Sequence, residues 1–224
     1  MGISLPVTGL VRTGEERATL VRRTYTLVFF GVLLTVVGAT YALANTALMA
    51  QVVAHPILSA IAIFVPLLAA QGARTRFPLN IAMVALFTFA MGVWISPALY
   101  MFRQRDPTIV PQAAALTLGA FAVLTLYAWV SRRDFSAWGG FFTVGLFVLI
   151  GTSLLNLFFR NPTADLWLAG GTVVIFSGLL VFDTWRLRNV FGPDDYVMAA
   201  VQIYLDLLNL FLGLLRILGG GRRN

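Results

Sequence analysis

Asp206 belongs to a group of polar and small residues that recur at helical spacing in the last hydrophobic segment of the chain. The group consists of Gln202, Asp206, Asn209, Gly213 and Arg216. At 100° per residue these side chains project within about 40° of one direction, and the rest of the segment is mostly aliphatic or aromatic. A carboxylate facing lipid costs several kcal/mol, so in a bilayer the stripe is expected to face protein or a water-filled cavity. Hydrogen bonding between helices is its simplest role, but the intramembrane acid favours a functional one.

A second acid, Asp183, lies near the end of the preceding hydrophobic segment. The connection between the two segments centres on Gly192–Pro193–Asp194, and residues 183 and 206 are 11 and 12 positions from Asp194. In an antiparallel hairpin rising about 1.5 Å per residue, both carboxyls lie at a similar depth. The sequence therefore permits a di-aspartate pair. The alternative is that Asp183 is a helix-end residue that pairs with Arg186 or with solvent.

Paired carboxylates in a low-dielectric site have a distinctive chemistry. They cannot easily both ionise, so they share a proton at lower pH and titrate as a unit. When deprotonated, they offer hard oxygen ligands to a cation such as Ca²⁺. We therefore interpret Asp183 and Asp206 as a candidate proton sensor and as candidate Ca²⁺ ligands.

A further polar face occurs in the hydrophobic segment 138–159 and at its end. It carries Thr152, Ser153, Asn156 and Arg160, and the last two are four positions apart, on one helical face. Hydrogen bonding between helices is the favoured interpretation. Asn156 is also a candidate member of a pore or polar network with the stripe residues Gln202, Asn209 and Arg216.

The composition indicates what kind of protein must position these residues. Hydrophobic residues make up 59% of the 224 positions and charged residues 11%, and the mean hydropathy is +0.86. A soluble domain of this size cannot hide so much apolar surface. The chain has no Cys and one His, which excludes disulfides, thiolate chemistry and a poly-histidine metal centre.

Long stretches without charge predict an all-α integral membrane protein. They hold six strong membrane spans, and a seventh is weaker because Asp206, Asn209 and Arg216 interrupt it. The expected helical cores are 26–47, 53–73, 79–101, 110–130, 138–159, 166–188 and 197–218. We expect a cytoplasmic tail over 1–24, a seven-helix transmembrane domain over 25–219 and a short tail over 220–224.

The formal charge of +7 comes from arginines at the ends of the hydrophobic segments. This distribution argues against nucleic-acid binding. Ten of these arginines fall on the side of the N-terminus and three on the other side, so the positive-inside rule predicts a cytoplasmic N-terminus. Arg222 and Arg223 lie outside if the last segment spans the membrane and inside if it is re-entrant, and both arrangements remain open.

Four stretches resemble the Bax inhibitor-1 (transmembrane Bax-inhibitor-motif) family. The most specific is VQIYLDLLNLFLGLLRILG at 201–219, and FTFAMGVWISP at 87–97 is similar to the third-span motif of the family. The others are SRRDFSAWGGFF at 131–142 and FDTWRLRN at 182–189. The resemblance covers nearly all of the chain after the N-terminal tail.

The resemblance implies seven helices, six of them around a central C-terminal helix, and a pH-sensitive calcium leak channel. The family's aspartate pair falls on Asp183 and Asp206. An arginine that interacts with this pair in bacterial members falls on Arg74, and Arg76 is a neighbour that could replace it. Many relatives carry an acid where Met91 stands here, so a cation path that uses that acid is in doubt. The implied location is a bacterial inner membrane, with Ca²⁺ as the transported ion and no cofactor.

Two other classes of function remain as alternatives. An intramembrane aspartyl protease also needs two membrane aspartates, but Tyr204–Leu205–Asp206 lacks the Gly-x-Gly-Asp signature that such proteases share, so we do not expect an enzyme. A membrane interaction protein would contact the bilayer and another membrane protein, such as a protease or a channel, without transport of its own. A secondary transporter is disfavoured because no substrate-binding constellation is visible, although an ion exchanger stays open.

Overall fold

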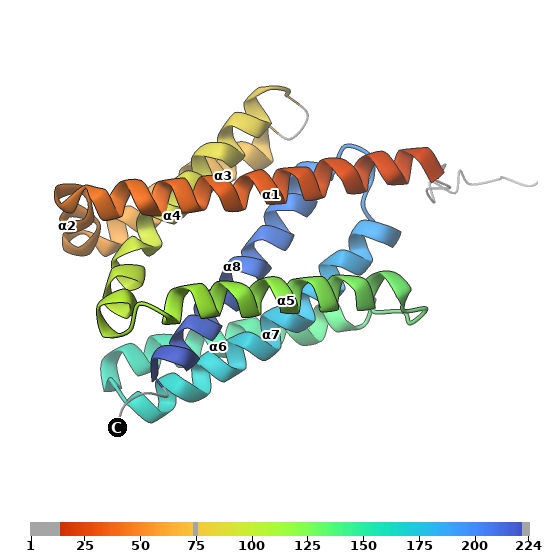
Figure 1. Ribbon diagram of the computed structural model, residues 1–224. Helices are drawn as coiled ribbons and strands as arrows, with labels where there is room; N and C mark the ends of the chain where they lie inside the picture. The colour runs from red at the N-terminus through yellow and green to blue at the C-terminus, as the bar shows by residue number, and fades with distance from the viewer. Residues whose placement is uncertain (1–13, 74–75, 221–224) are drawn as a thin grey trace, which may run out of the picture.

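The computed structural model describes residues 14–73 and 76–220, and within them every regular element is a helix. The helices run antiparallel or obliquely across one bundle (Figure 1). They are α1 (Gly14–Ala44), α2 (Thr46–Ala54), α3 (Pro56–Gly72), α4 (Leu79–Arg105), α5 (Ile109–Val130), α6 (Trp138–Phe159), α7 (Pro162–Asn189) and α8 (Tyr196–Gly220).

The membrane spans agree with the predicted ones except around the second. Within residues 14–73 and 76–220, six helices are long and apolar enough to cross a bilayer, which gives seven spans if the pair α2 and α3 counts as one. This pair is bent by 100° at His55, because Pro56 begins a new helix there. Asn45 caps the other end of the short helix α2, where its side chain accepts from the backbone N–H of Leu48. The predicted core 53–73 therefore corresponds to α3, which has 17 residues.

Helix α1 begins earlier than predicted. We expected a tail over residues 1–24, but the helix already starts at Gly14. Glu15 and Glu16 lie in its first turn, where negative charge complements the helix dipole. Leu20 and Val28 are buried at helical spacing and join a core cluster that also holds Leu187. Packing against α7 and α8 thus extends the helix beyond its apolar segment.

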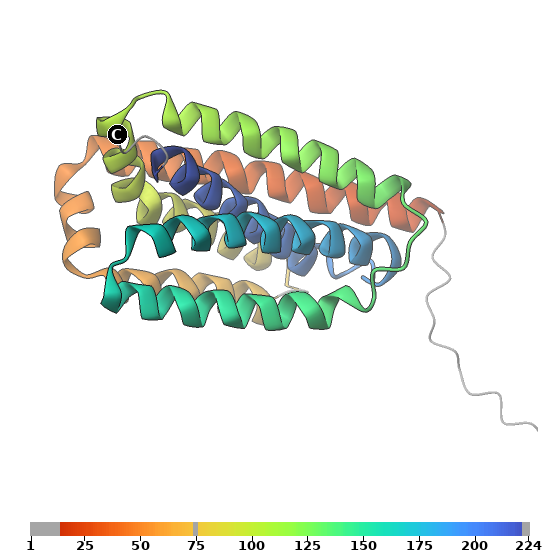
Figure 2. The ribbon, with the colours of Figure 1, turned by 90° about the horizontal axis from the view of Figure 1, so that it is seen from below.

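Helix α8 lies in the centre of the bundle, as the resemblance predicts. It contacts α1, α3, α4, α5 and α7, and 61% of its most apolar 18-residue window is buried. Its first residue, Tyr196, accepts a hydrogen bond from Asn80 at the start of α4, and Gly219 lies against Phe102 near the end of α4. The helix therefore runs unbroken from one end of the bundle to the other (Figure 2), which favours the spanning arrangement over a re-entrant one.

Helix α6 is peripheral. Among the described residues it contacts only α7. Of the residues in its most apolar 18-residue stretch, 6% are buried. The bundle is thus five elements around α8, with α6 added outside α7.

Helices α1 and α4 cross at two glycines. A Cβ added at Gly38 would overlap the carbonyl oxygen of Phe89, and a Cβ added at Gly92 would overlap that of Thr35. Such small residues let helix backbones approach closely in membranes. On α8, Tyr204 completes the junction, since its hydroxyl lies 2.6 Å from Oγ1 of Thr35.

Candidate functional site

Asp183 and Asp206 lie side by side between α7 and α8. Both residues are buried, with 6% and 4% of their surface exposed. Their carboxyls are close enough for one to donate a hydrogen bond to the other when a proton is present. The short turn after Asn189 folds α8 back along α7, and this hairpin brings the two acids to the same depth, as their spacing from the turn predicts.

Arg186 is the basic partner of this acid pair among the described residues. Its Nη1 donates to Oδ1 of Asp183 over 3.1 Å and to Oε1 of Gln202 over 3.2 Å. The guanidinium also lies 4.5 Å from the ring centroid of Phe191, a distance suited to a cation–π contact. Arg186 therefore joins α7 to α8. From the sequence we predicted Arg186 only as the alternative partner of Asp183, although its i, i+3 spacing from Asp183 already indicated that the two side chains could meet.

One oxygen of the pair has no hydrogen bond. Oδ2 of Asp206 is buried and lacks a partner among the described residues. An ionised carboxylate buried without partners is expensive, whereas a protonated pair distributes one proton over both groups.

The structure describes only one of the two arginines assigned from the family resemblance. Arg74 lies outside the described residues. Arg76 is exposed in the connection between α3 and α4, where its carbonyl oxygen accepts from the backbone N–H of Asn80 over 3.0 Å. Their proposed contact with the acids stays a prediction.

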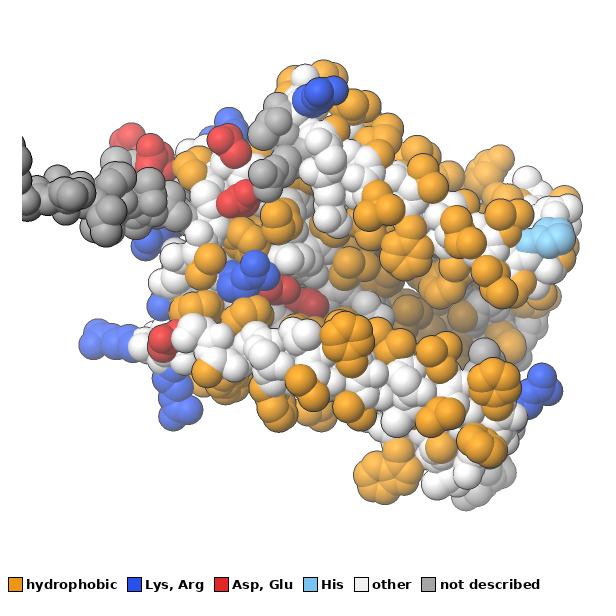
Figure 3. Space-filling view, turned by 180° about the vertical axis from the view of Figure 1, so that it is seen from behind, with side chains coloured by type: hydrophobic (Ala, Val, Ile, Leu, Met, Phe, Trp, Pro, Cys, Tyr) orange, Lys and Arg blue, Asp and Glu red, His pale blue; other side chains and the backbone are white. Residues whose placement is uncertain are grey.

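The polar stripe of α8 divides into two faces. Asp206 and Gly213 are buried, and Gly213 packs against Thr172 and Val173 of α7. The other face remains partly exposed, and we call it the open face of α8. It consists of Met198, Gln202, Leu205, Asn209, Leu212 and Arg216, at alternating steps of four and three. Figure 3 shows one side of the molecule hollowed between apolar walls, with acidic and basic side chains gathered in the hollow.

Arg216 and Asn156 meet in a small pocket at the other end of the bundle. The pocket has a volume of about 360 Å³ and is also lined by Ser153 and Arg160. Arg216 forms an ion pair with Asp165 at the start of α7. Asn156 accepts a hydrogen bond from the backbone N–H of Asn161, so it also stabilises the turn after α6. The pocket lies about 15 Å along α8 from Asp206, at the far end of the open face.

Asn209 is less available for hydrogen bonds to other helices than its place in the polar stripe suggested. Its Nδ2 donates to the carbonyl oxygen of Leu205 over 2.8 Å within the same helix. Its amide oxygen and its second amide N–H are left to serve the open face, because the amide group has two donors as well as an accepting oxygen.

The acid pair alone does not make a dedicated metal site. Within the described residues no three His, Cys, Asp or Glu side chains gather to hold an ion. Ca²⁺ takes six to eight oxygens, so Asp183 and Asp206 supply only part of its coordination.

Comparison with known proteins gives one family and a set of distant relatives. The family described as "Inhibitor of apoptosis-promoting Bax1" matches residues 17–224. The mouse "Protein lifeguard 4" is 32% identical over 90% of this chain and 85% of its own length. The vaccinia virus "Golgi anti-apoptotic protein" is 36% identical over 65% of this chain, and the match spans 60% of the viral protein. An "Uncharacterized membrane protein" of Vibrio cholerae is 36% identical over 60% of each chain.

Proposed function

Because this chain belongs to the Bax inhibitor-1 family and folds as an all-helical membrane protein, we propose that it conducts Ca²⁺ passively at a rate set by pH. We place it in a bacterial inner membrane with a cytoplasmic N-terminus. The observation that supports a pH-controlled gate is the buried pair of Asp183 and Asp206, with Arg186 on one side of it.

In the proposed mechanism a shared proton keeps the gate closed. With one proton, the two carboxyls attract each other, and Arg186 clamps Asp183 to Gln202. Loss of that proton leaves two carboxylates in a poorly solvated site, where their repulsion is strong. The proposal is that α7 and α8 then separate at this point and that α3 shifts, with Arg74 as a further latch on the pair.

The open face of α8 is the proposed path for the ion. It offers the amide oxygen of Gln202 on one side of the acid pair and that of Asn209 between the pair and the pocket at the far end, where Asp165 stands beside Arg216. Polar residues that line a path inside a membrane protein commonly face a water-filled cavity. A hydrated Ca²⁺ is the cargo we propose.

Reconstitution tests this proposal directly. Purified protein in liposomes that hold a Ca²⁺-sensitive dye should admit Ca²⁺ faster at pH 8 than at pH 6, because deprotonation opens the gate. Protein-free liposomes and liposomes with heat-denatured protein give the background. Flux at the background level across this pH range would refute the leak.

A second candidate function is that of a membrane interaction protein. The observation that favours it is the peripheral position of α6, whose outward face carries Phe141, Phe147 and Phe158, each at least 70% exposed. Such a face fits a helix of another membrane protein as well as lipid. Co-purification of a stable partner, lost when Phe147 is replaced by Ala, together with silence in the flux assay, would favour this function.

A further inference from the structure

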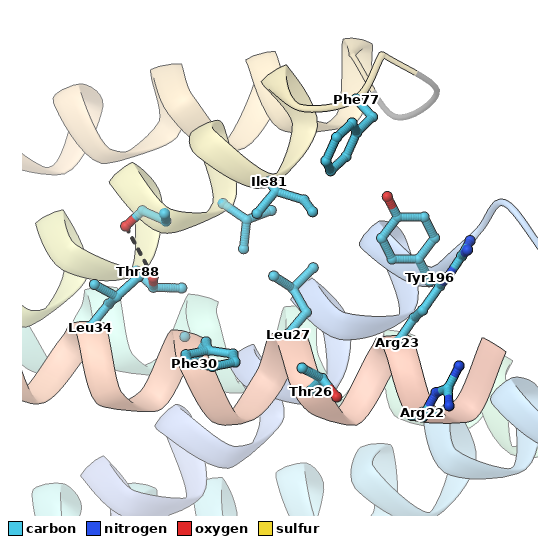
Figure 4. Close-up of a pocket in the computed structure, with 13 residues that line it drawn as sticks. Arg22, Arg23, Thr26, Leu27, Phe30, Leu34, Phe77, Ile81, Thr88 and Tyr196 are labelled. Carbon is cyan, nitrogen blue, oxygen red and sulfur yellow. Dashed lines mark hydrogen bonds between the residues drawn. The ribbon is translucent and has the colours of Figure 1, made fainter. Parts of the chain in front are cut away.

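A deep groove separates α1 from α4 at the end of the bundle where α1 and α8 begin. Its volume is about 890 Å³, within the range of about 300–1,000 Å³ typical of ligand sites. Figure 4 shows side chains of both helices projecting into it, among them Leu27 from α1 and Ile81 from α4. The groove is separate from the acid pair, which lies between α7 and α8.

The crossing of α1 and α4 explains the shape of this groove. The two helices touch backbone to backbone at Gly38 and Gly92 and diverge from there toward Arg22 and Phe77. The groove thus lies between the diverging parts of the two helices, on one side of the glycine crossing. Along α1 it extends from Arg22 to Leu34, which is about 18 Å at 1.5 Å per residue. One leaflet of a bilayer has a hydrocarbon depth of about 15 Å, so the groove matches one leaflet.

The walls and the mouth of the groove differ in chemistry. The walls are apolar, apart from the hydroxyls of Thr26 and Thr88. The mouth carries two adjacent exposed arginines, Arg22 and Arg23, and neither forms an ion pair among the residues that the structure describes.

Arg23 lies beside an aromatic ring at the end of the groove. Its guanidinium lies 5.6 Å from the ring centroid of Tyr196, and the Tyr196 hydroxyl accepts a hydrogen bond from the buried Asn80 over 3.0 Å. The ring is thereby held as the end wall of the groove, with the cation beside it. A guanidinium without an ion-pair partner suits a phosphate group.

We propose that this groove binds a phospholipid with an anionic headgroup. Its phosphate lies on Arg22 and Arg23, and an acyl chain occupies the space between α1 and α4 down to Thr88. A bilayer supplies such a molecule at the correct depth and orientation, and basic pockets between membrane helices are suited to anionic headgroups. This lipid site does not depend on the proposed Ca²⁺ leak.

Native mass spectrometry of the detergent-purified chain tests the headgroup contact. Phosphatidylglycerol should bind more tightly than phosphatidylcholine with the same acyl chains. The double substitution Arg22→Gln and Arg23→Gln should lower the affinity for phosphatidylglycerol about tenfold to thirtyfold, since each arginine near a headgroup contributes on the order of 1 kcal/mol. The matched control is Arg132→Gln with Arg133→Gln, an exposed pair outside the groove, which should leave it unchanged.

A second variant tests the acyl-chain part of the site. Ala85→Trp fills the groove and should reduce the binding of both lipids, whereas Ala115→Trp, on the exposed surface of α5, should not. Glycerol phosphate, which lacks acyl chains, should not compete. The proposal is overturned if Ala85→Trp binds lipid as the parent does, if glycerol phosphate displaces phosphatidylglycerol, or if both arginine double variants weaken binding equally.

Discussion

The guanidinium of Arg186 lies 3.1 Å from the carboxylate of Asp183, one helical turn away on α7, and the same nitrogen reaches Gln202 on α8. A proton on the acid pair would therefore compete with the positive charge of Arg186 for the carboxylate of Asp183. A nearby positive charge favours the ionised form of a carboxyl, and its removal favours the protonated form.

Replacing Arg186 by Gln should therefore shift the pH dependence of Ca²⁺ flux. Without the cation the pair holds its shared proton to higher pH, so the midpoint of flux against pH should rise, by about one pH unit for each 1.4 kcal/mol of lost interaction. Arg186→Lys keeps the charge and should shift the midpoint less. A midpoint that stays in place in Arg186→Gln, in protein that still elutes as a single species, would remove Arg186 from the gate.

The glycine crossing of α1 and α4 should be intolerant of even one methyl group. Gly38→Ala or Gly92→Ala forces the added Cβ against backbone carbonyls, so the helices must move apart. Overpacking of this kind typically costs about 1–3 kcal/mol, and we expect a lower melting temperature in detergent. The measurement is thermal unfolding followed by circular dichroism or by dye binding.

Gly119 is the matched control for this crossing. A Cβ at Gly119 meets no atom within 4 Å, and Ala favours a helix over Gly by about 1 kcal/mol. Gly119→Ala should therefore be neutral or stabilising. Equal melting temperatures for Gly92→Ala and Gly119→Ala would contradict the close crossing.

The hydroxyl of Tyr204 should stabilise the centre of the bundle. It lies 2.6 Å from Oγ1 of Thr35, which itself donates toward the carbonyl oxygens of Gly31 and Thr88. Tyr204→Phe keeps the ring against Phe87 and removes only the hydroxyl, so we expect a loss of about 1 kcal/mol in the free energy of unfolding. Tyr127→Phe, at a half-exposed position on α5, serves as the comparison and should show no loss.

Much of the fold follows from the sequence because the bilayer requires long apolar helices. Five of the six strong spans, the central last helix and the shared depth of Asp183 and Asp206 all rest on patterns of hydrophobicity and on chain length between turns. The bend at His55 could also be anticipated, since Pro56 cannot continue a helix, but its angle depends on packing against α4.

Other features depend on contacts that no pattern along one chain reveals. The helical start of α1 at Gly14 comes from burial of Leu20 against α7 and α8. The division of the α8 stripe into a buried and an open face is set by which neighbours cover α8. The spacing of Asp183 to Arg186 was visible in the sequence, but the reach of Arg186 across to Gln202 was not, because it depends on the register of α7 against α8.

Ca²⁺ flux against pH in proteoliposomes of Asp206→Asn tests the central claim most directly. Asn is the neutral counterpart of a protonated carboxyl, so this variant should stay closed and show a low flux that does not change between pH 6 and pH 8. Asp183→Asn should behave in the same way. Asp194→Asn, in the exposed turn between α7 and α8, should retain the flux and pH dependence of the parent chain. If Asp183→Asn and Asp206→Asn keep both the flux and its pH dependence, the acid pair is not the gate.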